Sequence, residues 1–442
     1  MRKIIIILFS IILVLILFFI SCQKQNTSPT KDNSVEKLKS LPYLIWVPMD
    51  AEDKLKSGVT LYDEDLSFKG ANIYNSRHRG VAHLIDMEGN ILHNWSADKG
   101  KYHQIKMNEQ GDLFAIVKNV RLIKLDWDSN IIWTNELRYH HDLDIAENGD
   151  IYSITTETIE VPYKSNTIPI ENDYIITLSP DGKVKKKISI LHLMEGNIMI
   201  NQETDEEIAE HFKAYPDEPF DPFHTNSIEI IKRDINGFAH KGDLLISIRE
   251  WSLIAVIDIE KEKLVWSWGE NILKRQHHPT LLDNGNIMIF DNGGNEGYSR
   301  IVGLNPIAKE IAWMFQPVKR ELFYSGLMGG NQMLPNGNLL ITESDSGRIF
   351  EVSEVNISDT MKKREDEYFF KNNITQQKEP VSSLPMSKEG KIVWEFWNPE
   401  IRKAENKRAA IHRMMRFDPE ILSNLPFDKK TIKYLKVNKY ID

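Results

Sequence analysis

Histidines recur at one distance from a turn glycine in this chain of 442 residues. His103, His141 and His277 each lie eight residues before a glycine. These glycines are Gly111, Gly149 and Gly285. His224 begins a similar segment, whose turn is displaced by the insertion 233–241. The recurrence predicts equivalent positions in repeated units, where side chains far apart in the sequence can meet.

The residue types suit chemistry on an anion. Imidazole can act as a nucleophile or move a proton near neutral pH, because its ordinary pKa is near 6.5. Asn226 and Arg249 accompany His224, and an arginine can direct two N–H donors at two oxygens of one oxyanion. Two other interpretations stay open. The histidines could bind Zn, Cu or Ni, or they could only hydrogen-bond neighbouring strands of a non-catalytic binding protein.

Two kinds of strand pair alternate along the chain and must position these residues. The first kind has an apolar entry strand and often ends on tryptophan. Its six copies are residues 83–95, 122–135, 176–188, 255–268, 302–315, and 350–356 with 387–396. The second kind has two alternating apolar runs joined by a turn of sequence x-Gly-Asp or x-Gly-Asn, where x is any residue. This pattern is a hairpin signature. Its five copies are residues 102–116, 140–154, 224–231 with 242–248, 277–290 and 330–342.

Two such pairs per unit give the four strands of one propeller blade, and the units repeat about every 40–50 residues. The sequence therefore predicts an all-β fold, a single six-bladed β-propeller domain over residues 41–442. Equivalent positions of successive blades surround the central axis, so the recurring histidines are expected to converge there.

Several segments interrupt the repeat. We expect insertions at 155–172, at 189–223 with a short helix around residues 206–213, and at 357–386, which is charged and helical in character. Insertions on a repeat array map to loops on one face, which is often the binding face.

A C-terminal extension, residues 397–442, is expected to pack over that face with its arginine-rich part, residues 408–416. Arg413 and Arg416 are weaker candidates for anion binding. A solvated helix face is the favoured interpretation of these two residues.

The N-terminus has the layout of an export signal. Arg2 and Lys3 precede the apolar run 4–20, and Cys22 follows it. The end of the run resembles a bacterial lipobox, which implies cleavage before Cys22 and a lipid on its sulfur. Residues 1–22 are thus predicted to be a lipoprotein signal peptide, and residues 23–40 a flexible tether. The folded part is expected to be anchored to a membrane and to face the periplasm or the cell surface. A retained signal anchor is the alternative.

Composition excludes several function classes. The chain has 64 acidic against 55 basic residues, and loss of residues 1–22 removes two basic ones, leaving a net charge of −11. This balance argues against nucleic acid as a partner, and an anionic substrate would need a local basic site. The one cysteine rules out an intramolecular disulfide and a cysteine-based metal cluster.

Several segments together resemble one family, the bacterial arylsulfotransferases. They are HHDLDIAENGDI, FHTNS, GDLLISIRE, RQHHPTLLDNGNIMIFDNGG and GGNQMLPNGNLLITE, within roughly residues 80–350. The resemblance implies a six-bladed propeller that moves a sulfuryl group between phenols without a nucleotide sulfate donor.

The resemblance also implies residue roles. His277 would be the nucleophile that is transiently sulfated. The residues implied to surround the sulfuryl oxygens are His141, His224, Asn226 and Arg249. The doublets His140-His141 and His277-His278 leave the assignment ambiguous by one residue, and the equal distance to the turn glycine favours His141 and His277.

Such a reaction suits imidazole. A neutral nitrogen attacks the sulfate monoester without adding a second negative charge, and a covalent intermediate divides the transfer into two steps with ping-pong kinetics. The partners implied are an aryl sulfate and a phenolic acceptor, and no metal or cofactor is required.

Overall fold

The computed structural model describes residues 45–97, 100–194, 202–317, 319–353 and 390–441. The predicted signal peptide with Cys22, the tether 23–40 and the insertion 357–386 lie outside these residues. In the described part, no helix is both long and apolar enough to cross a membrane.

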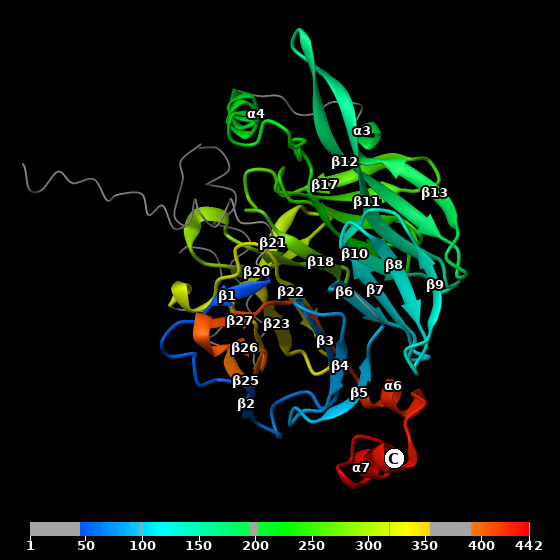
Figure 1. Cartoon of the computed structure of the whole chain (residues 1–442), viewed down its shortest axis with the longest axis vertical. Coiled ribbons are helices and arrows are strands. Elements are labelled where there is room, and N and C mark those ends of the chain that lie inside the picture. Colours follow the sequence, from blue (N-terminus) through cyan, green and yellow to red (C-terminus); the bar gives the residue numbers. More distant parts are fainter. Residues whose placement is uncertain (1–44, 98–99, 195–201, 318, 354–389, 442) are drawn as a thin grey trace, which may run out of the picture. The chain divides into compact units, whose positions relative to one another are not determined.

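Within the described residues, antiparallel strands form six sheets of four or five strands (Figure 1). The first three sheets, in strand order, are β28 (Ile411–Phe417), β3 (Ala71–Ser76), β4 (Ala82–Ile85) and β5 (Ile91–Trp95); β6 (Tyr102–Met107), β7 (Leu113–Val117), β8 (Arg121–Leu125) and β9 (Ile131–Asn135); and β10 (Tyr139–Ile145), β11 (Ile151–Tyr163), β12 (Asn166–Leu178) and β13 (Val184–Ser189). The other three are β14 (Thr225–Ile230), β15 (Leu244–Ile248), β16 (Leu253–Asp258) and β17 (Lys263–Trp268); β18 (His277–Leu281), β19 (Ile287–Asp291), β20 (Arg300–Asn305) and β21 (Glu310–Phe315); and β22 (Gly330–Met333), β23 (Leu339–Glu343), β24 (Arg348–Ser353), β25 (Lys391–Trp397) and β2 (Gly58–Tyr62).

The first strands of these sheets contact one another in a closed cycle. β28 contacts β6, and the contacts continue through β10, β14, β18 and β22 back to β28. A cycle of four-stranded antiparallel sheets is the arrangement of a β-propeller. The predicted all-β architecture of repeated four-stranded sheets is confirmed, and all eleven predicted strand pairs are present.

The sheet that closes the cycle is made from both ends of the folded region. β28 pairs with β3, from Ile411 opposite Ser76 to Phe417 opposite Ala71. The C-terminal extension therefore includes an innermost strand, and residues 408–416 do not form the expected helix face. The sequence repeat shows six outer pairs but five inner ones because the sixth inner pair joins strands more than 300 residues apart, which no local hairpin pattern reveals.

Outer-strand tryptophans connect adjacent sheets. Trp95 Nε1 donates to the Gly111 carbonyl at 3.2 Å, and Trp394 Nε1 donates to the Met87 carbonyl at 2.8 Å. Both tryptophan side chains are fully buried. Each such ring covers apolar area and satisfies its one donor at a turn of the next sheet, which explains why tryptophan recurs at the end of the outer strand.

The insertions are more regular than the sequence suggests. Residues 155–172 continue β11 and β12 as a long hairpin, paired without interruption from Ile151 opposite Leu178 to Tyr163 opposite Asn166 (Figure 1). The helix predicted around residues 206–213 is confirmed as α4 (Gln202–Ala214).

The remaining described elements are short. They are the strands β1 (Trp46–Pro48), β26 (Ile401–Arg402) and β27 (Lys407–Ala409), the helices α3 (Ile190–Leu193), α6 (Pro419–Asn424) and α7 (Lys429–Val437), and the 3₁₀ turns η1 (Gly294–Glu296), η2 (Arg320–Leu322), η3 (Ser344–Ser346) and η5 (Lys403–Glu405). Leu422 of α6 and Leu435 of α7 are buried in the same apolar cluster as Trp95. The chain after β28 therefore contributes to the core of the first sheet.

Candidate active site

Histidines from four of the innermost strands and from the residue before β14 lie together. We define the histidine cluster as His103, His140, His141, His224, His277, His278 and His412. The imidazole centroid of His141 lies 5.3 Å from that of His103 and 4.7 Å from that of His224. The imidazole centroid of His412 lies 4.7 Å from that of His103. The cycle of first strands thus brings together side chains that are up to 309 residues apart in the sequence.

Irregular backbone directs these side chains. The β-ladder register shifts between His140 and Leu143, between Thr225 and Ser227, and after His277. Bulges of this kind re-aim side chains and occur next to active sites. The left-handed φ values of His141 (57°), His224 (48°) and His278 (46°) have the same effect.

His277 has its proton fixed on one nitrogen. Its Nδ1 lies 2.8 Å from Asn292 Oδ1, and Asn292 Nδ2 donates to the carbonyls of Ser325 (2.6 Å) and Met328 (2.9 Å). These two bonds orient the amide, so its oxygen faces His277 and Nδ1 must carry the hydrogen. Burial lowers the pKa of His277 to about 3, and Arg249 and Arg413 act in the same direction. The imidazole is therefore neutral at pH 7, with a lone pair on Nε2.

That Nε2 atom is buried and has no hydrogen-bond partner among the described residues. A buried nitrogen lone pair without a partner is unfavourable in the free protein, and it is available to a bound electrophile. His277 thus presents a nucleophilic nitrogen to the site.

His278 has the opposite tautomer. Its Nδ1 accepts a hydrogen bond from the backbone N–H of Asn331 at 3.1 Å. Burial, with the charge of Arg413, lowers the pKa of His278 well below its ordinary value, so the ring is neutral. Its hydrogen is consequently on Nε2, and this histidine is a donor there.

Three further imidazoles form a chain between two carboxyl groups. His224 Nδ1 contacts Asp221, His224 Nε2 lies 3.2 Å from His141 Nε2, and the Nδ1 atoms of His141 and His140 are 2.7 Å apart. His140 Nε2 lies 3.1 Å from Asp173 Oδ1. Burial lowers the pKa values of His141 and His224 well below the ordinary range. The chain can hold and pass protons within the cluster.

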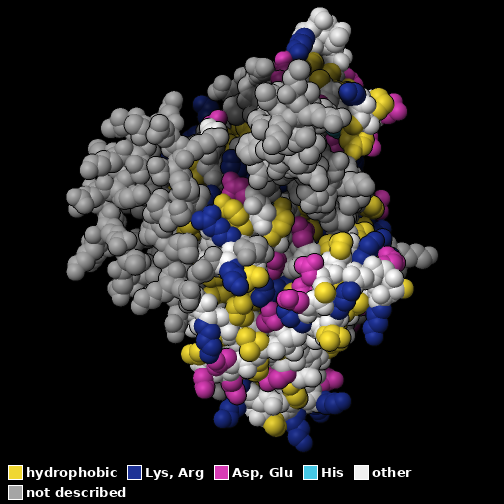
Figure 2. Space-filling model, turned by 90° about the vertical axis from the view of Figure 1, so that its left-hand side faces the viewer, with side chains coloured by type: hydrophobic (Ala, Val, Ile, Leu, Met, Phe, Trp, Pro, Cys, Tyr) yellow, Lys and Arg dark blue, Asp and Glu magenta, His cyan; other side chains and the backbone are white. Residues whose placement is uncertain are grey.

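Arginines lie beside the cluster, together with a buried lysine whose amine is mostly neutral at pH 7. Burial and the charges of Arg77 and Arg249 lower the pKa of Lys118 to about 6. Arg77 Nη2 donates to His103 Nδ1 at 3.0 Å. On the face seen in Figure 2, basic and acidic side chains are mixed over the described residues. The basic character that an anion requires is therefore local to the cluster.

Two predicted residues have partners within the protein. Arg249 Nε donates to Glu250 Oε1 at 2.8 Å, and Arg275 Nη2 donates to the same oxygen at 2.6 Å. Asn226 Nδ2 donates to the Gln276 carbonyl at 2.9 Å, next to His277. Arg249 lies close enough for its charge to lower the pKa of His277, whereas this bond of Asn226 connects the start of β14 to the start of β18.

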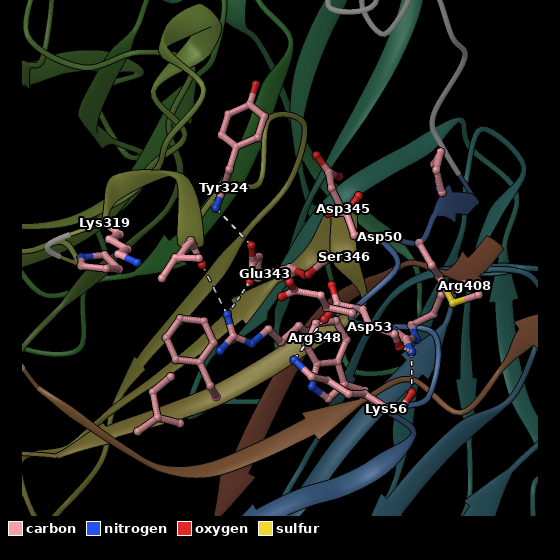
Figure 3. Close-up of a pocket in the computed structure, with 18 of the residues that line it drawn as sticks. Asp50, Asp53, Lys56, Lys319, Tyr324, Glu343, Asp345, Ser346, Arg348 and Arg408 are labelled. Atoms are coloured by element: carbon pink, nitrogen blue, oxygen red, sulfur yellow. Dashed lines mark hydrogen bonds and ion pairs between the residues drawn. The ribbon is translucent and has the colours of Figure 1, made fainter. Parts of the chain in front are cut away.

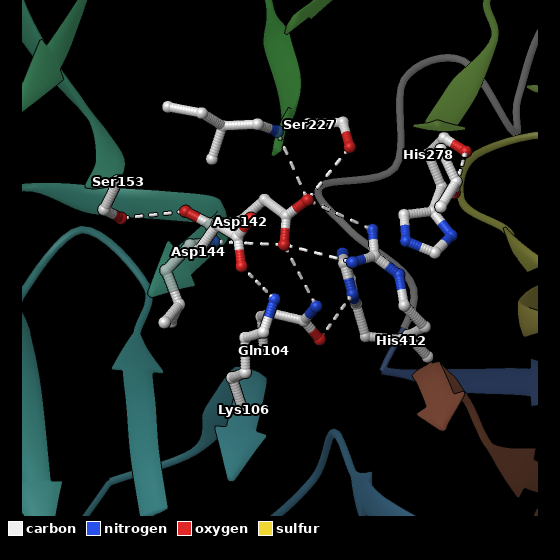
Figure 4. A network of polar contacts seen from close by, with 12 residues as sticks. Gln104, Lys106, Asp142, Asp144, Ser153, Ser227, His278 and His412 are labelled. Atoms are coloured by element: carbon white, nitrogen blue, oxygen red, sulfur yellow. Dashed lines mark hydrogen bonds and ion pairs between the residues drawn. The ribbon is translucent and has the colours of Figure 1, made fainter. Parts of the chain in front are cut away.

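β28 contributes His412, which the sequence did not indicate, and Arg413, which the sequence indicated only as a weaker candidate for anion binding. His412 is buried in the cluster, and Arg413 donates to both oxygens of Asp142, from Nη1 at 3.0 Å and from Nη2 at 3.4 Å (Figure 4). Asp142 also accepts from Gln104 Nε2 at 3.2 Å and Ser227 Oγ at 2.9 Å. Four sheets thus meet at one carboxylate. The excess of outer over inner strand pairs was the sequence signal for a missing inner strand.

A cavity of about 980 Å³ lies beside the sixth sheet (Figure 3). Acidic and basic side chains line it together, among them Asp50, Glu343, Arg348 and Arg408. Burial raises the pKa of Glu343 to about 7. Among the described residues that line this cavity there is no histidine, so it is separate from the cluster.

The described residues contain no group of three or more His, Cys, Asp or Glu side chains that could hold a metal ion. The predicted alternative of a histidine metal site therefore has no preformed ligand set in this part of the chain.

Comparisons with known proteins give one family and several distant structures. No curated protein matches the chain. A protein of unknown function from Bacteroides caccae is 12% identical, with a TM-score of 0.48, and the alignment covers 79% of this chain and 99% of that one. A streptogramin B lyase is 14% identical (TM-score 0.42; 85% and 98% covered), and virginiamycin B lyase from Staphylococcus aureus is 12% identical (TM-score 0.41; 70% and 85% covered).

The family model for arylsulfotransferase (ASST) matches residues 119–361, which include β10, β14 and β18 with their histidines. Because this match spans more than half of the 442 residues, the chain belongs to the arylsulfotransferase (ASST) family.

Proposed function

We propose that this protein moves a sulfuryl group from an aryl sulfate to a phenol, through a sulfohistidine formed at His277 on the axis of a six-bladed β-propeller. The observation that carries the proposal is the state of His277: Nδ1 is held by Asn292, and Nε2 is buried without a partner among the described residues. Membership of the arylsulfotransferase family supports the reaction class.

In the first step, His277 Nε2 attacks sulfur, the N–S bond forms and the S–O bond to the phenolic oxygen breaks. The leaving phenolate takes one proton and departs as a phenol. In the second step a new phenol attacks the same sulfur, its proton is released, and His277 regains its lone pair. The two steps balance, and neither needs an oxidant or a cofactor.

The neighbours of His277 suit the charge of this reaction. The sulfuryl oxygens carry one negative charge, and Arg249 and Arg413 already lower the pKa of His277 by their positive charges. We propose that Arg249 turns part of its guanidinium from Glu250 to the bound anion. His141 and His224 supply hydrogen bonds or protons from their chain, and preorganised donors of this kind are typically worth about 10²–10³ in rate each.

Asn226 has a supporting role in this proposal. Its Nδ2 donates to Gln276 O, so Asn226 holds the backbone that carries His277. The sequence resemblance implies direct contact with the sulfuryl oxygens, and the hydrogen bond to Gln276 favours positioning instead.

The test is a single-turnover reaction of the fragment 23–442 with a chromogenic aryl sulfate and no acceptor. We expect rapid release of about one equivalent of phenol, then a slow phase, and a mass increase of one sulfuryl group on the peptide that contains His277. Added phenol should restore steady turnover. Absence of an adduct with every aryl sulfate tried, together with a stoichiometric metal in the purified protein, would instead favour a metal-dependent enzyme.

We further propose that the protein is exported and anchored by a lipid on Cys22. The support is the order of charged, apolar and small residues in 1–22 and the position of the single cysteine at its end.

A further inference from the structure

His412 is the histidine that the C-terminal strand adds to the cluster. Its side chain is buried, its imidazole packs against that of His103, and its Nδ1 lies 3.0 Å from Gln104 Oε1. β28 places it there, and β28 lies outside the residues matched by the family model.

The hydrogen bonds around His412 fix its tautomer. Gln104 Nε2 donates to Asp142 Oδ1 at 3.2 Å, and this carboxylate is also paired with Arg413. The amide nitrogen of Gln104 therefore faces Asp142, and its oxygen faces His412. A carbonyl oxygen only accepts, so His412 Nδ1 carries the hydrogen and Nε2 has the lone pair in the neutral ring.

His412 is neutral before substrate binds. Burial lowers the pKa of His412 well below its ordinary value, and the charges of Arg413 and Arg77 add to this. His277 and Lys118 also act on it in the same direction. The Nε2 atom is buried and has no hydrogen-bond partner in the described part of the chain.

The other lone pairs of the cluster already have partners. His103 Nδ1 accepts from Arg77, and His278 Nδ1 accepts from the N–H of Asn331. His141 and His224 contact each other through their Nε2 atoms. Once His277 carries a sulfuryl group, its Nε2 is used as well. His412 Nε2 is then the open lone pair in the described cluster.

We infer that His412 is the general base that takes the proton of the acceptor phenol, and that its protonated form gives a proton to the departing phenolate. This inference rests on the proposed sulfuryl transfer. The two half-reactions are chemically the reverse of each other, so one group serves both by microscopic reversibility.

The proton and bond changes balance in each direction. The aryl sulfate brings a negative charge that favours protonation of His412, so one proton from solvent binds at His412 Nε2 together with the substrate. This proton passes to the phenolic oxygen as its bond to sulfur breaks and the N–S bond to His277 forms. As the acceptor oxygen bonds to sulfur, the N–S bond to His277 breaks and the O–H proton moves to His412 Nε2. The phenolic proton becomes strongly acidic as the O–S bond forms, so even a weak base can take it. The resulting imidazolium keeps its Nδ1–H bond to Gln104, whose amide is polarised by Asp142.

The test varies the acidity of the phenol in both half-reactions. A phenolate of low basicity leaves without a proton, whereas a phenol with an ordinary pKa of about 10 needs the base and acid. In His412→Gln we expect little change in the burst from 4-nitrophenyl sulfate. Transfer to unsubstituted phenol, and the burst from phenyl sulfate, should fall by about 10²–10⁴-fold, the usual contribution of general acid–base catalysis.

Controls separate this role from a structural one. Met415→Ala loosens the same strand at a residue that packs on the apolar cluster. It should change the rates with all phenols and aryl sulfates by the same factor. His240→Gln, whose side chain is 81% exposed, should leave every rate unchanged. Added imidazole should partly restore transfer to phenol in His412→Ala, which a packing defect does not permit.

Three results would count against the inference. An equal loss for acidic and weakly acidic phenols would make His412 a structural residue. A sulfuryl adduct on the peptide with His412 would make it the nucleophile. No burst from wild-type protein with any aryl sulfate would overturn the proposed function itself, and that outcome is distinct from the other two. If His412→Gln is unfolded by circular dichroism, Gln104→Leu keeps His412 and should show the same selective loss.

Discussion

Adjacent histidines in β18 differ in the nitrogen that carries the proton. His277 donates from Nδ1 to Asn292, and His278 accepts at Nδ1 from the backbone of Asn331. Neutral imidazole has one lone pair, so Nε2 is a nucleophile in His277 and a donor in His278. The residue-scale predictions depend on this difference.

His277→Ala should abolish both the phenol burst and the sulfuryl adduct, because the proposed attacking nitrogen is lost. His278→Ala is the matched control and should still form the adduct. His141→Ala should slow the burst and still allow some adduct. Peptide mass spectrometry after reaction with an aryl sulfate checks all three, and an adduct on His278 would contradict the assignment.

Arg249→Lys should lower the rate of sulfuryl transfer by about 10²–10³, because lysine keeps the charge and loses the planar pair of donors. The free energy of unfolding should change little. Arg275→Lys alters the second arginine bound to the same oxygen of Glu250, and its side chain is 39% exposed. Equal rates of sulfuryl transfer in Arg249→Lys and Arg275→Lys would show that Arg249 has no special role in binding the sulfuryl group.

Protonation of His277 should destabilise the folded protein. Its pKa is about 3 when folded and near 6.5 when unfolded, so unfolding takes up a proton in this interval. Stability from this group is complete above about pH 6.5 and is lost progressively as the pH falls towards 3. Burial raises the pKa of Glu229 to about 8. This group therefore has the opposite effect, because its contribution to stability is lost as the pH rises.

The difference between variants therefore isolates His277. Urea unfolding between pH 7.5 and 4.5 gives the free energy of unfolding at each pH. This free energy should depend less on pH in His277→Asn than in wild type, because up to one proton fewer is taken up on unfolding. His240→Asn serves as the exposed control. Parallel curves for wild type and His277→Asn would show that folding does not lower the pKa of the buried ring.

At the scale of elements, β28 both closes the cycle of sheets and supplies chemistry. Arg413 on this strand pairs with Asp142 on β10, and both side chains are buried. Arg416 on the same strand pairs with Glu351 of β24. Arginines expected on a solvated helix face are therefore internal ion pairs that hold the closing strand.

Arg413→Met should lower the free energy of unfolding by about 3–5 kcal/mol, because it leaves the Asp142 carboxylate buried without its cation. The double variant with Asp142→Asn should recover part of the loss. Arg402→Met removes an exposed pair with Glu405 and should cost about 0–1 kcal/mol. Urea unfolding measures each. A loss in Arg413→Met no larger than in Arg402→Met would mean that the buried pair is not what holds β28.

At the scale of the whole molecule, the net charge of −9 contrasts with the arginines beside the histidine cluster, and basic and acidic side chains are mixed on the described part of the face in Figure 2. The proposed anionic substrate would therefore be held by local donors, and would not be drawn in by the field of the whole protein.

The proposed lipid anchor at the N-terminus would set the location of the whole molecule. Cys22→Ala should abolish lipid labelling and release or stall the precursor, because the proposed lipid is attached to this sulfur. Radiolabelled fatty acid and membrane fractionation check the result. Unchanged membrane attachment with an uncleaved N-terminus would establish a signal anchor instead.

The sequence by itself determined the eleven strand pairs and the recurrence of His103, His141 and His277. Turn glycines, alternating apolar residues and terminal tryptophans are local signals, and each acts within about fifteen residues. The count of six outer pairs against five inner ones was a further local signal, but it does not say which segment supplies the sixth inner pair.

Only the tertiary structure decided the closing strand, the place of His412 and the tautomers of His277 and His278. Each of these depends on partners distant in the chain: β28 pairs with β3 across more than 300 residues, and a hydrogen bond from the Asn331 backbone sets the proton of His278. Pairing and proton position follow from which donor faces which acceptor in space, and sequence spacing does not contain that information.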